Sequence, residues 1–109
     1  MFNTEFDKRF RETLRELVAH FRELDSRPTV CLGIPVPVAL ERTRGITAPK
    51  VRGVVTPAIA AVARKEGLAT IDFYTPLADR MELLPDTFHP NAEGYRIMAE
   101  TAKRAILGE

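Results

Sequence analysis

Two short, largely apolar runs constrain the fold of this chain more than any other feature: "TVCLGI" at residues 29–34 and "ATIDFY" at residues 69–74. Both runs are rich in β-branched side chains and too short for buried helices, so both predict strands buried on both faces of a parallel sheet. Pro35 and Pro37 end the first run, because proline cannot donate to a strand ladder. Parallel neighbouring strands require a crossover, which is right-handed in almost all proteins.

A helical pattern between the two runs supplies that crossover. Apolar residues recur at helical spacing over residues 47–67, and Gly67 is a suitable C-terminal cap. Pro57 lies inside the pattern, and we therefore expect a kink or break near Val54.

Two further helices are predicted, one at each end of the chain. Residues 4–24 place six apolar side chains three or four positions apart, which predicts an apolar stripe that covers the sheet. The stripe consists of Phe6, Phe10, Leu14, Leu17, Phe21 and Leu24. Asn91 is expected to cap the last helix. Its predicted inner face consists of Tyr95, Met98, Ala99, Ala102 and Ile106.

Length and charge narrow the possible functions. The chain has 109 residues and a net charge of +1, with acidic and basic residues interspersed. Bulk charge therefore recruits neither nucleic acid nor an anionic membrane surface. No apolar run approaches the roughly 20 residues that span a bilayer, and the charged amino terminus does not resemble a signal peptide, so we expect a cytoplasmic protein. Cys31, the single cysteine, is expected to be a buried strand residue.

The segment "LLPDTFHPNAEGYRIMAE" holds an acid and a base, Asp86 and His89, three positions apart. It follows the second predicted strand, and ligands bind at the carboxyl ends of strands in parallel sheets. A carboxylate that accepts a hydrogen bond from Nδ1–H of a histidine prepares that ring to accept a proton. Two alternatives stay open: a helix-capping loop with a solvated acid and a surface histidine, and, less favoured, a metal site with only two ligands.

The same segment resembles the last conserved block of the SGNH hydrolases, the GDSL-type esterases and lipases. "PTVCLGIPVPV" and "VVTPAIAAVARKEGLATIDFYTPL" are similar to earlier parts of that family, and residues 4–24 are similar to the helix after its third block. The resemblance implies a three-layer, flavodoxin-like α/β fold, of which residues 1–109 form a single partial domain, the carboxyl-terminal half, with two parallel strands and about three helices. It also implies that Asp86 orients His89, the general base.

The branch most similar is that of the sialate O-acetylesterase-like carbohydrate acetylesterases. The resemblance then implies a small-molecule or carbohydrate ester as substrate and no cofactor or metal. The family also uses a serine in a Gly-Asp-Ser turn and a glycine and an asparagine that stabilise the oxyanion.

Those residues are not found here. Ser26 is the only serine, and "ELDSRPT" places it before a strand, at the edge of the sheet opposite His89. Thr75 and Thr87 lie near the correct edge, but neither sits on a strand-to-helix turn that would activate its hydroxyl. Asn3 lacks the family's Gly-x-Asn-Asp context. We therefore predict that the chain alone has no triad-type esterase activity.

Three hypotheses follow. The chain is part of a GDSL-type hydrolase whose amino-terminal half is not among these residues; or it is a non-catalytic binding or assembly module that uses an exposed sheet edge; or it is an unrelated small α/β domain. Under the first two, an uncovered strand edge predicts self-association, pairing with a complementary amino-terminal fragment, or aggregation.

Overall fold

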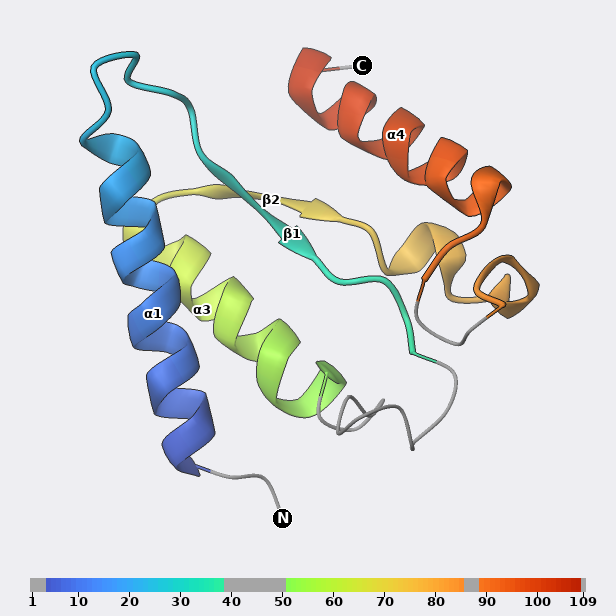
Figure 1. Cartoon of the computed structure of the whole chain (residues 1–109), viewed down its shortest axis with the longest axis horizontal. Helices are drawn as coiled ribbons and strands as arrows, with labels where there is room; N and C mark the ends of the chain where they lie inside the picture. Colours follow the sequence, from blue (N-terminus) through green and yellow to red (C-terminus); the bar gives the residue numbers. More distant parts are fainter. Residues whose placement is uncertain (1–3, 39–50, 86–88, 109) are drawn as a thin grey trace.

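The computed structural model describes residues 4–38, 51–85 and 89–108. Three α-helices and two strands alternate along this part of the chain, joined by short 3-10 and π-helical segments (Figure 1). The elements are α1 (Thr4–Arg22), β1 (Cys31–Ile34), the π-helical η1 (Val51–Val55), α3 (Thr56–Glu66), β2 (Ala69–Asp72), the 3-10 turns η2 (Thr75–Leu77) and η3 (Met81–Leu83), and α4 (Ala92–Leu107). The predicted α/β class, with two parallel strands and three helices, is confirmed.

β1 and β2 pair in parallel, from Cys31 opposite Ala69 to Ile34 opposite Asp72. Phe73 continues the pairing, since its N–H donates to the carbonyl of Ile34 at 3.1 Å. α3 packs against both strands on one face of this sheet, and α4 packs against β2 on the other (Figure 1). The layers are therefore helices, sheet and helix.

Burial of both strands on both faces was predicted wrongly. Ile71 is the one buried residue of the two strands, and Cys31, expected inside, is exposed. The reason is the arrangement of α4, which packs on β2 and on η2 and leaves the same face of β1 open. Residue type identified the strands, but burial depends on what covers them.

The helical crossover breaks where Pro57 predicts. η1 is π-helical up to Val55, and regular α-helix begins at Thr56, because proline lacks the N–H that would continue the hydrogen-bond ladder. Gly67 ends α3 in the left-handed conformation, with φ of 69°, as its position predicts. The predicted start of this helix, at residues 47–50, lies outside the described residues.

α1 packs beside α3 with a face that agrees only in part with the predicted one: Phe6, Phe10 and Leu14 of the stripe are half-buried. Val18 is its buried residue, at 2% exposure, whereas Leu17, Phe21 and Leu24 remain 45–51% exposed. The helix contacts α3 and η1, and ion pairs join it to α3: the Glu66 carboxylate on α3 pairs with Arg15 at 3.4 Å and with Arg22 at 3.0 Å. Part of the predicted apolar stripe is therefore exposed.

The predicted inner face of α4 is confirmed only in part, at Met98 and the half-buried Ala102. Ile97 and Met98 pack on a small core of Leu77, Leu83 and Leu84, three residues of the loop after β2. Tyr95 and Ile106, predicted to face inward, are 53% and 69% exposed, and Ala99 is exposed as well. Within the described ranges, no helix has both the length and the apolar character needed to cross a membrane.

Candidate active site

The parallel strands bring two connecting segments to one edge of the sheet. Residues 35–38 follow the carboxyl end of β1, and residues 73–85 follow that of β2 (Figure 1). His89 and Pro90 then lead into α4. The predicted site segment therefore does start from the edge of the sheet at which parallel α/β proteins bind ligands.

Buried leucines anchor the loop that precedes His89. Leu77 is 0% exposed, and Leu83 and Leu84 are 6% and 2% exposed. They pack together with Val36, which follows β1. This core ties the segments after both strands to each other and to α4.

Asn91 joins the same loop to α4 through its backbone and its side chain. Its N–H donates to the Leu83 carbonyl at 2.7 Å, and its Oδ1 accepts from the Gly94 N–H at 2.9 Å. The predicted N-cap is therefore confirmed. His89, two residues earlier, is exposed on the solvent side of this junction.

The structure describes only one of the two predicted site residues. Asp86 lies outside the described residues, as does Thr87, so the pairing of Asp86 with His89 stays a prediction. Ser26 lies in the turn before β1, at the amino edge of the sheet, as expected. The Thr75 hydroxyl donates to Asp72 Oδ2 at 2.5 Å.

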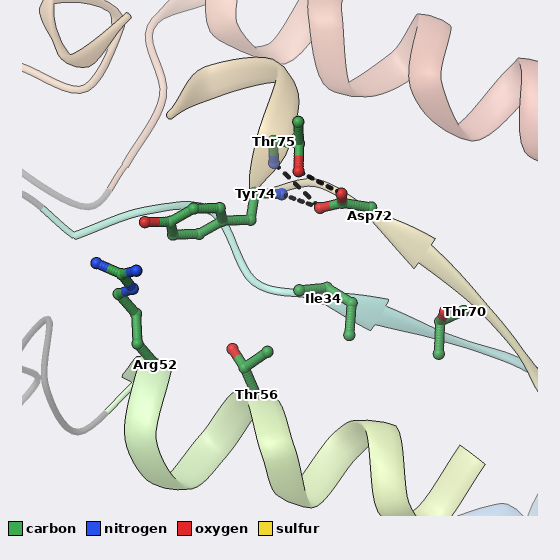
Figure 2. A pocket seen from close by; sticks show the side chains of 7 residues that line it. All are labelled: Ile34, Arg52, Thr56, Thr70, Asp72, Tyr74 and Thr75. Atoms are coloured by element: carbon green, nitrogen blue, oxygen red, sulfur yellow. Dashed lines mark hydrogen bonds between the residues drawn. The ribbon is translucent and has the colours of Figure 1, made fainter. Parts of the chain in front are cut away.

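Asp72, which sequence reasoning left unremarked, organises the carboxyl end of β2. Its Oδ1 accepts from the N–H groups of Tyr74 at 2.8 Å and Thr75 at 3.1 Å (Figure 2). Partial burial raises the pKa of this carboxyl, but the hydrogen bonds from Thr75 and Tyr74 outweigh burial and hold the pKa below its usual value. An aspartate followed at i+2 and i+3 by a strand-ending turn is a recognisable Asx-turn signal. The sequence pattern predicts a strand to Tyr74, whereas β2 ends at Asp72.

An open depression lies beside this turn, between the amino end of α3 and the carboxyl ends of the strands (Figure 2). Its volume is about 390 Å³. Residues of β1, η1, α3, β2 and the segment after β2 line it. They are Ile34, Arg52, Thr56, Thr70, Asp72, Tyr74 and Thr75. The guanidinium carbon of Arg52 stands 5.7 Å from the centre of the Tyr74 ring.

Among residues 4–38, 51–85 and 89–108, no three His, Cys, Asp or Glu side chains are grouped so that they could hold a metal ion. The fold and the position of His89 place this chain among the parallel α/β proteins that carry a histidine in a loop at the carboxyl edge of the sheet. Comparison with known families identifies the particular family: the model of the GDSL-like lipase/acylhydrolase family matches residues 1–97.

The chain therefore belongs to the GDSL-like lipase/acylhydrolase family. The matched range includes Asp86 and His89. No curated protein and no solved structure matches the chain. The predicted SGNH family is thus confirmed, and the likeness to carbohydrate acetylesterases stays a prediction.

Proposed function

We propose that this chain supplies the acid and the base, Asp86 and His89, of a serine esterase that removes acetyl groups from a carbohydrate or small-molecule ester. Membership of an acylhydrolase family over residues 1–97 supports this role most directly. The place of His89 supports it as well, since the segment leaves the carboxyl edge of a parallel sheet and is held by the Asn91 cap.

In this role, His89 works twice. It first takes the proton of a serine hydroxyl as that oxygen attacks the acyl carbonyl, and it gives the proton to the departing alcohol. It then takes a proton from water, which attacks the acyl-enzyme, and returns a proton to the serine as the acid leaves. Asp86 accepts a hydrogen bond from Nδ1–H and stabilises the imidazolium in both halves of the reaction.

The serine must come from polypeptide other than these 109 residues. Ser26 lies at the opposite edge of the sheet from the His89 segment. In a well-studied serine hydrolase, loss of the nucleophile lowers the turnover rate by a factor on the order of a million. We therefore propose that the chain alone does not turn over esters by a triad mechanism.

An activated acetyl ester, p-nitrophenyl acetate, tests both statements. The purified chain alone should give no turnover that His89→Ala abolishes. Mixed with a polypeptide that carries the family's Gly-Asp-Ser and Gly-x-Asn-Asp blocks, it should give turnover that His89→Ala and Asp86→Asn lower at least a hundredfold. His20 is exposed on α1, and His20→Ala is the matched control.

Two results would contradict the proposal. His89-dependent turnover by the chain alone would show that a nucleophile lies within these residues. Equal turnover by the His89→Ala and His20→Ala variants in the complemented enzyme would remove His89 from the reaction.

A second candidate function, a non-catalytic binding or assembly module, has its own supporting observation. β1 has one edge unpaired within the described residues, and six large apolar side chains are 45–69% exposed: Leu17, Phe21, Leu24, Tyr95, Ile106 and Leu107. Unpaired strand edges and exposed apolar side chains favour association.

Cys31 offers a direct probe of this candidate, since it is the only cysteine and is exposed on β1. Association through that edge should slow the labelling of Cys31 by a maleimide as protein concentration rises. Light scattering should show the mean mass rising over the same range. A constant monomer mass with constant labelling would exclude an assembly role through this edge.

A further inference from the structure

α1 has a partly exposed side, the outer face, which is turned away from α3. Its positions alternate in spacing between four and three residues, a pattern typical of helices that pair with another helix. They are Phe6, Phe10, Thr13, Leu17 and His20. Val18, on the side packed against α3, is 2% exposed, whereas Leu17 is 51% exposed. α1 also lies on the outer side of the layer that it forms with α3, where a second molecule can reach it (Figure 1).

The amino-terminal half of the outer face is hollowed. Phe6 and Phe10 stack there, with ring centres 6.0 Å apart and an angle of 25° between the ring planes. The hollow has a volume of about 460 Å³ and is lined by Glu5, Phe6, Arg9, Phe10 and Thr13. The carboxyl-terminal half of the same face carries the exposed Leu17 instead. The outer face therefore offers an apolar hollow at one end and an apolar side chain at the other.

Two opposite charges, Arg9 and Glu16, flank the outer face. They are seven positions apart and so lie on the same side of the helix. Both are exposed, and neither forms an ion pair within residues 4–38, 51–85 and 89–108. The base belongs to the amino-terminal half of α1 and the acid to the carboxyl-terminal half. Their midpoint lies beside Thr13, the middle residue of the helix. This distribution of charge complements itself when the helix is turned end for end.

We propose that the outer face of α1 binds the outer face of a second copy of this chain, with the two helices antiparallel. A two-fold axis close to Thr13 places Arg9 of each copy level with Glu16 of the other. The same alignment places Leu17 of each copy between the levels of Phe6 and Phe10 of the other, over the hollow. One rotation thus satisfies both the charges and the hollow twice, which is the property of a self-complementary interface.

The dimer dissociates on dilution, because its contact is small. α1 has 19 residues and is therefore about 28 Å long. A contact of that length and one helix wide buries less than the about 800 Å² per partner of a standard stable interface. The dimer goes beyond the proposed esterase function and is independent of it, since a second copy brings only a second Ser26 and does not complete the triad.

Analytical ultracentrifugation of the whole chain tests the pairing. The original chain should show a monomer–dimer equilibrium. Arg9→Glu and Glu16→Arg should each weaken the dimer at least about fivefold, because each substitution places like charges together at both ends of the contact. An equimolar mixture of the two variants should recover the original affinity. In that heterodimer, a base again faces an acid at both ends, which holds only if the helices are antiparallel.

Lys8→Glu is the matched control for charge, because Lys8 is exposed on the side of α1 opposite the outer face. It should leave the affinity unchanged, and its mixture with Glu16→Arg should stay weak. Leu17→Ala should weaken the dimer about tenfold, since it removes the side chain that covers the hollow. Leu107→Ala is its control, because Leu107 is a 59% exposed leucine on α4. Far-UV circular dichroism checks that each variant is folded.

Three results would overturn the α1 dimer. A monomer mass at every concentration would leave the outer face to a different polypeptide, such as a complementary amino-terminal half. Equal losses from Lys8→Glu and Arg9→Glu, with no recovery in the mixture, would indicate repulsion by net charge alone. A dimer that slows the labelling of Cys31 but is insensitive to Arg9→Glu and Leu17→Ala would place the contact at the edge of β1 instead.

Discussion

Gly94 and Pro90 approach so closely that a Cβ atom on Gly94 would lie 2.7 Å from the Cβ of Pro90. The same atom would lie 3.2 Å from the carbonyl oxygen of Leu83. Gly94 is buried in the first turn of α4, and Pro90 directly follows His89. The missing side chain therefore lets η3 and the His89 segment pack against one turn of helix.

Gly94→Ala should for this reason destabilise the protein. Alanine normally stabilises a helical position relative to glycine by about 1 kcal/mol. Here the added methyl must displace the Pro90 ring or the Leu83 backbone, and overpacking of this kind costs about 1–3 kcal/mol. Urea unfolding followed by circular dichroism should show a lower midpoint. A raised midpoint would mean that the loop moves aside without cost.

Asn91→Ala should lower the free energy of unfolding by about 1 kcal/mol, because it removes the acceptor of the Gly94 N–H at the start of α4. Asn91→Asp is the control, since an aspartate caps a helix about as well as an asparagine. Equal losses from both substitutions in urea unfolding would assign the effect to something other than the cap.

The Asp72 turn predicts how stability depends on acid. The folded-state pKa of Asp72 lies below its usual value of 3.8, so the unfolded chain binds this proton more tightly than the folded chain does. The stability that Asp72 contributes is thus present above about pH 4 and is lost as pH falls through the lowered folded-state pKa. Asp72→Asn should remove this part of the acid dependence.

The measurement is urea unfolding at a series of pH values from 2 to 6. Asp79→Asn is the matched control, because Asp79 is an exposed acid in the loop between η2 and η3. The slope of stability against pH below about pH 4 should fall more in Asp72→Asn than in Asp79→Asn. Identical slopes in the two variants would mean that the turn hydrogen bonds to Asp72 are not kept in solution.

Local signals in the sequence were sufficient to predict the order and type of the secondary-structure elements. Apolar periodicity indicated α1 and α4, β-branched runs indicated β1 and β2, and Pro57 indicated the break before α3. Asn91 and Gly67 were predicted correctly as caps, because capping depends on one side chain and the backbone beside it.

Burial and clustering were less predictable, because they depend on which surfaces meet. Cys31 has the character of a core residue but is exposed, since α4 packs on the neighbouring strand. Tyr95 belongs to the apolar pattern of α4 but points away from the leucine core. Arg52 and Tyr74, 22 positions apart, meet only because the crossover returns the chain to the same edge of the sheet.

Val18 and Phe21, three positions apart on α1, provide the sharpest test of how this helix packs. Val18 is 2% exposed beside α3, whereas Phe21 is 45% exposed. Val18→Ala should cost about 2 kcal/mol of unfolding free energy, and Phe21→Ala should cost less, although phenylalanine loses more atoms. The comparison should be made at a concentration where light scattering gives the monomer mass.

At higher protein concentration, substitutions at Val18 and Phe21 should also differ in their effect on association. If association covers the exposed stripe of α1, Phe21→Lys should lower the mean mass in light scattering, because a charge on that stripe opposes apolar contact. Val18→Ala should leave association at this stripe intact as long as the variant remains folded. A cost of about 3–5 kcal/mol for Phe21→Ala in the monomer, typical of a buried phenylalanine, would instead show that the predicted stripe faces inward.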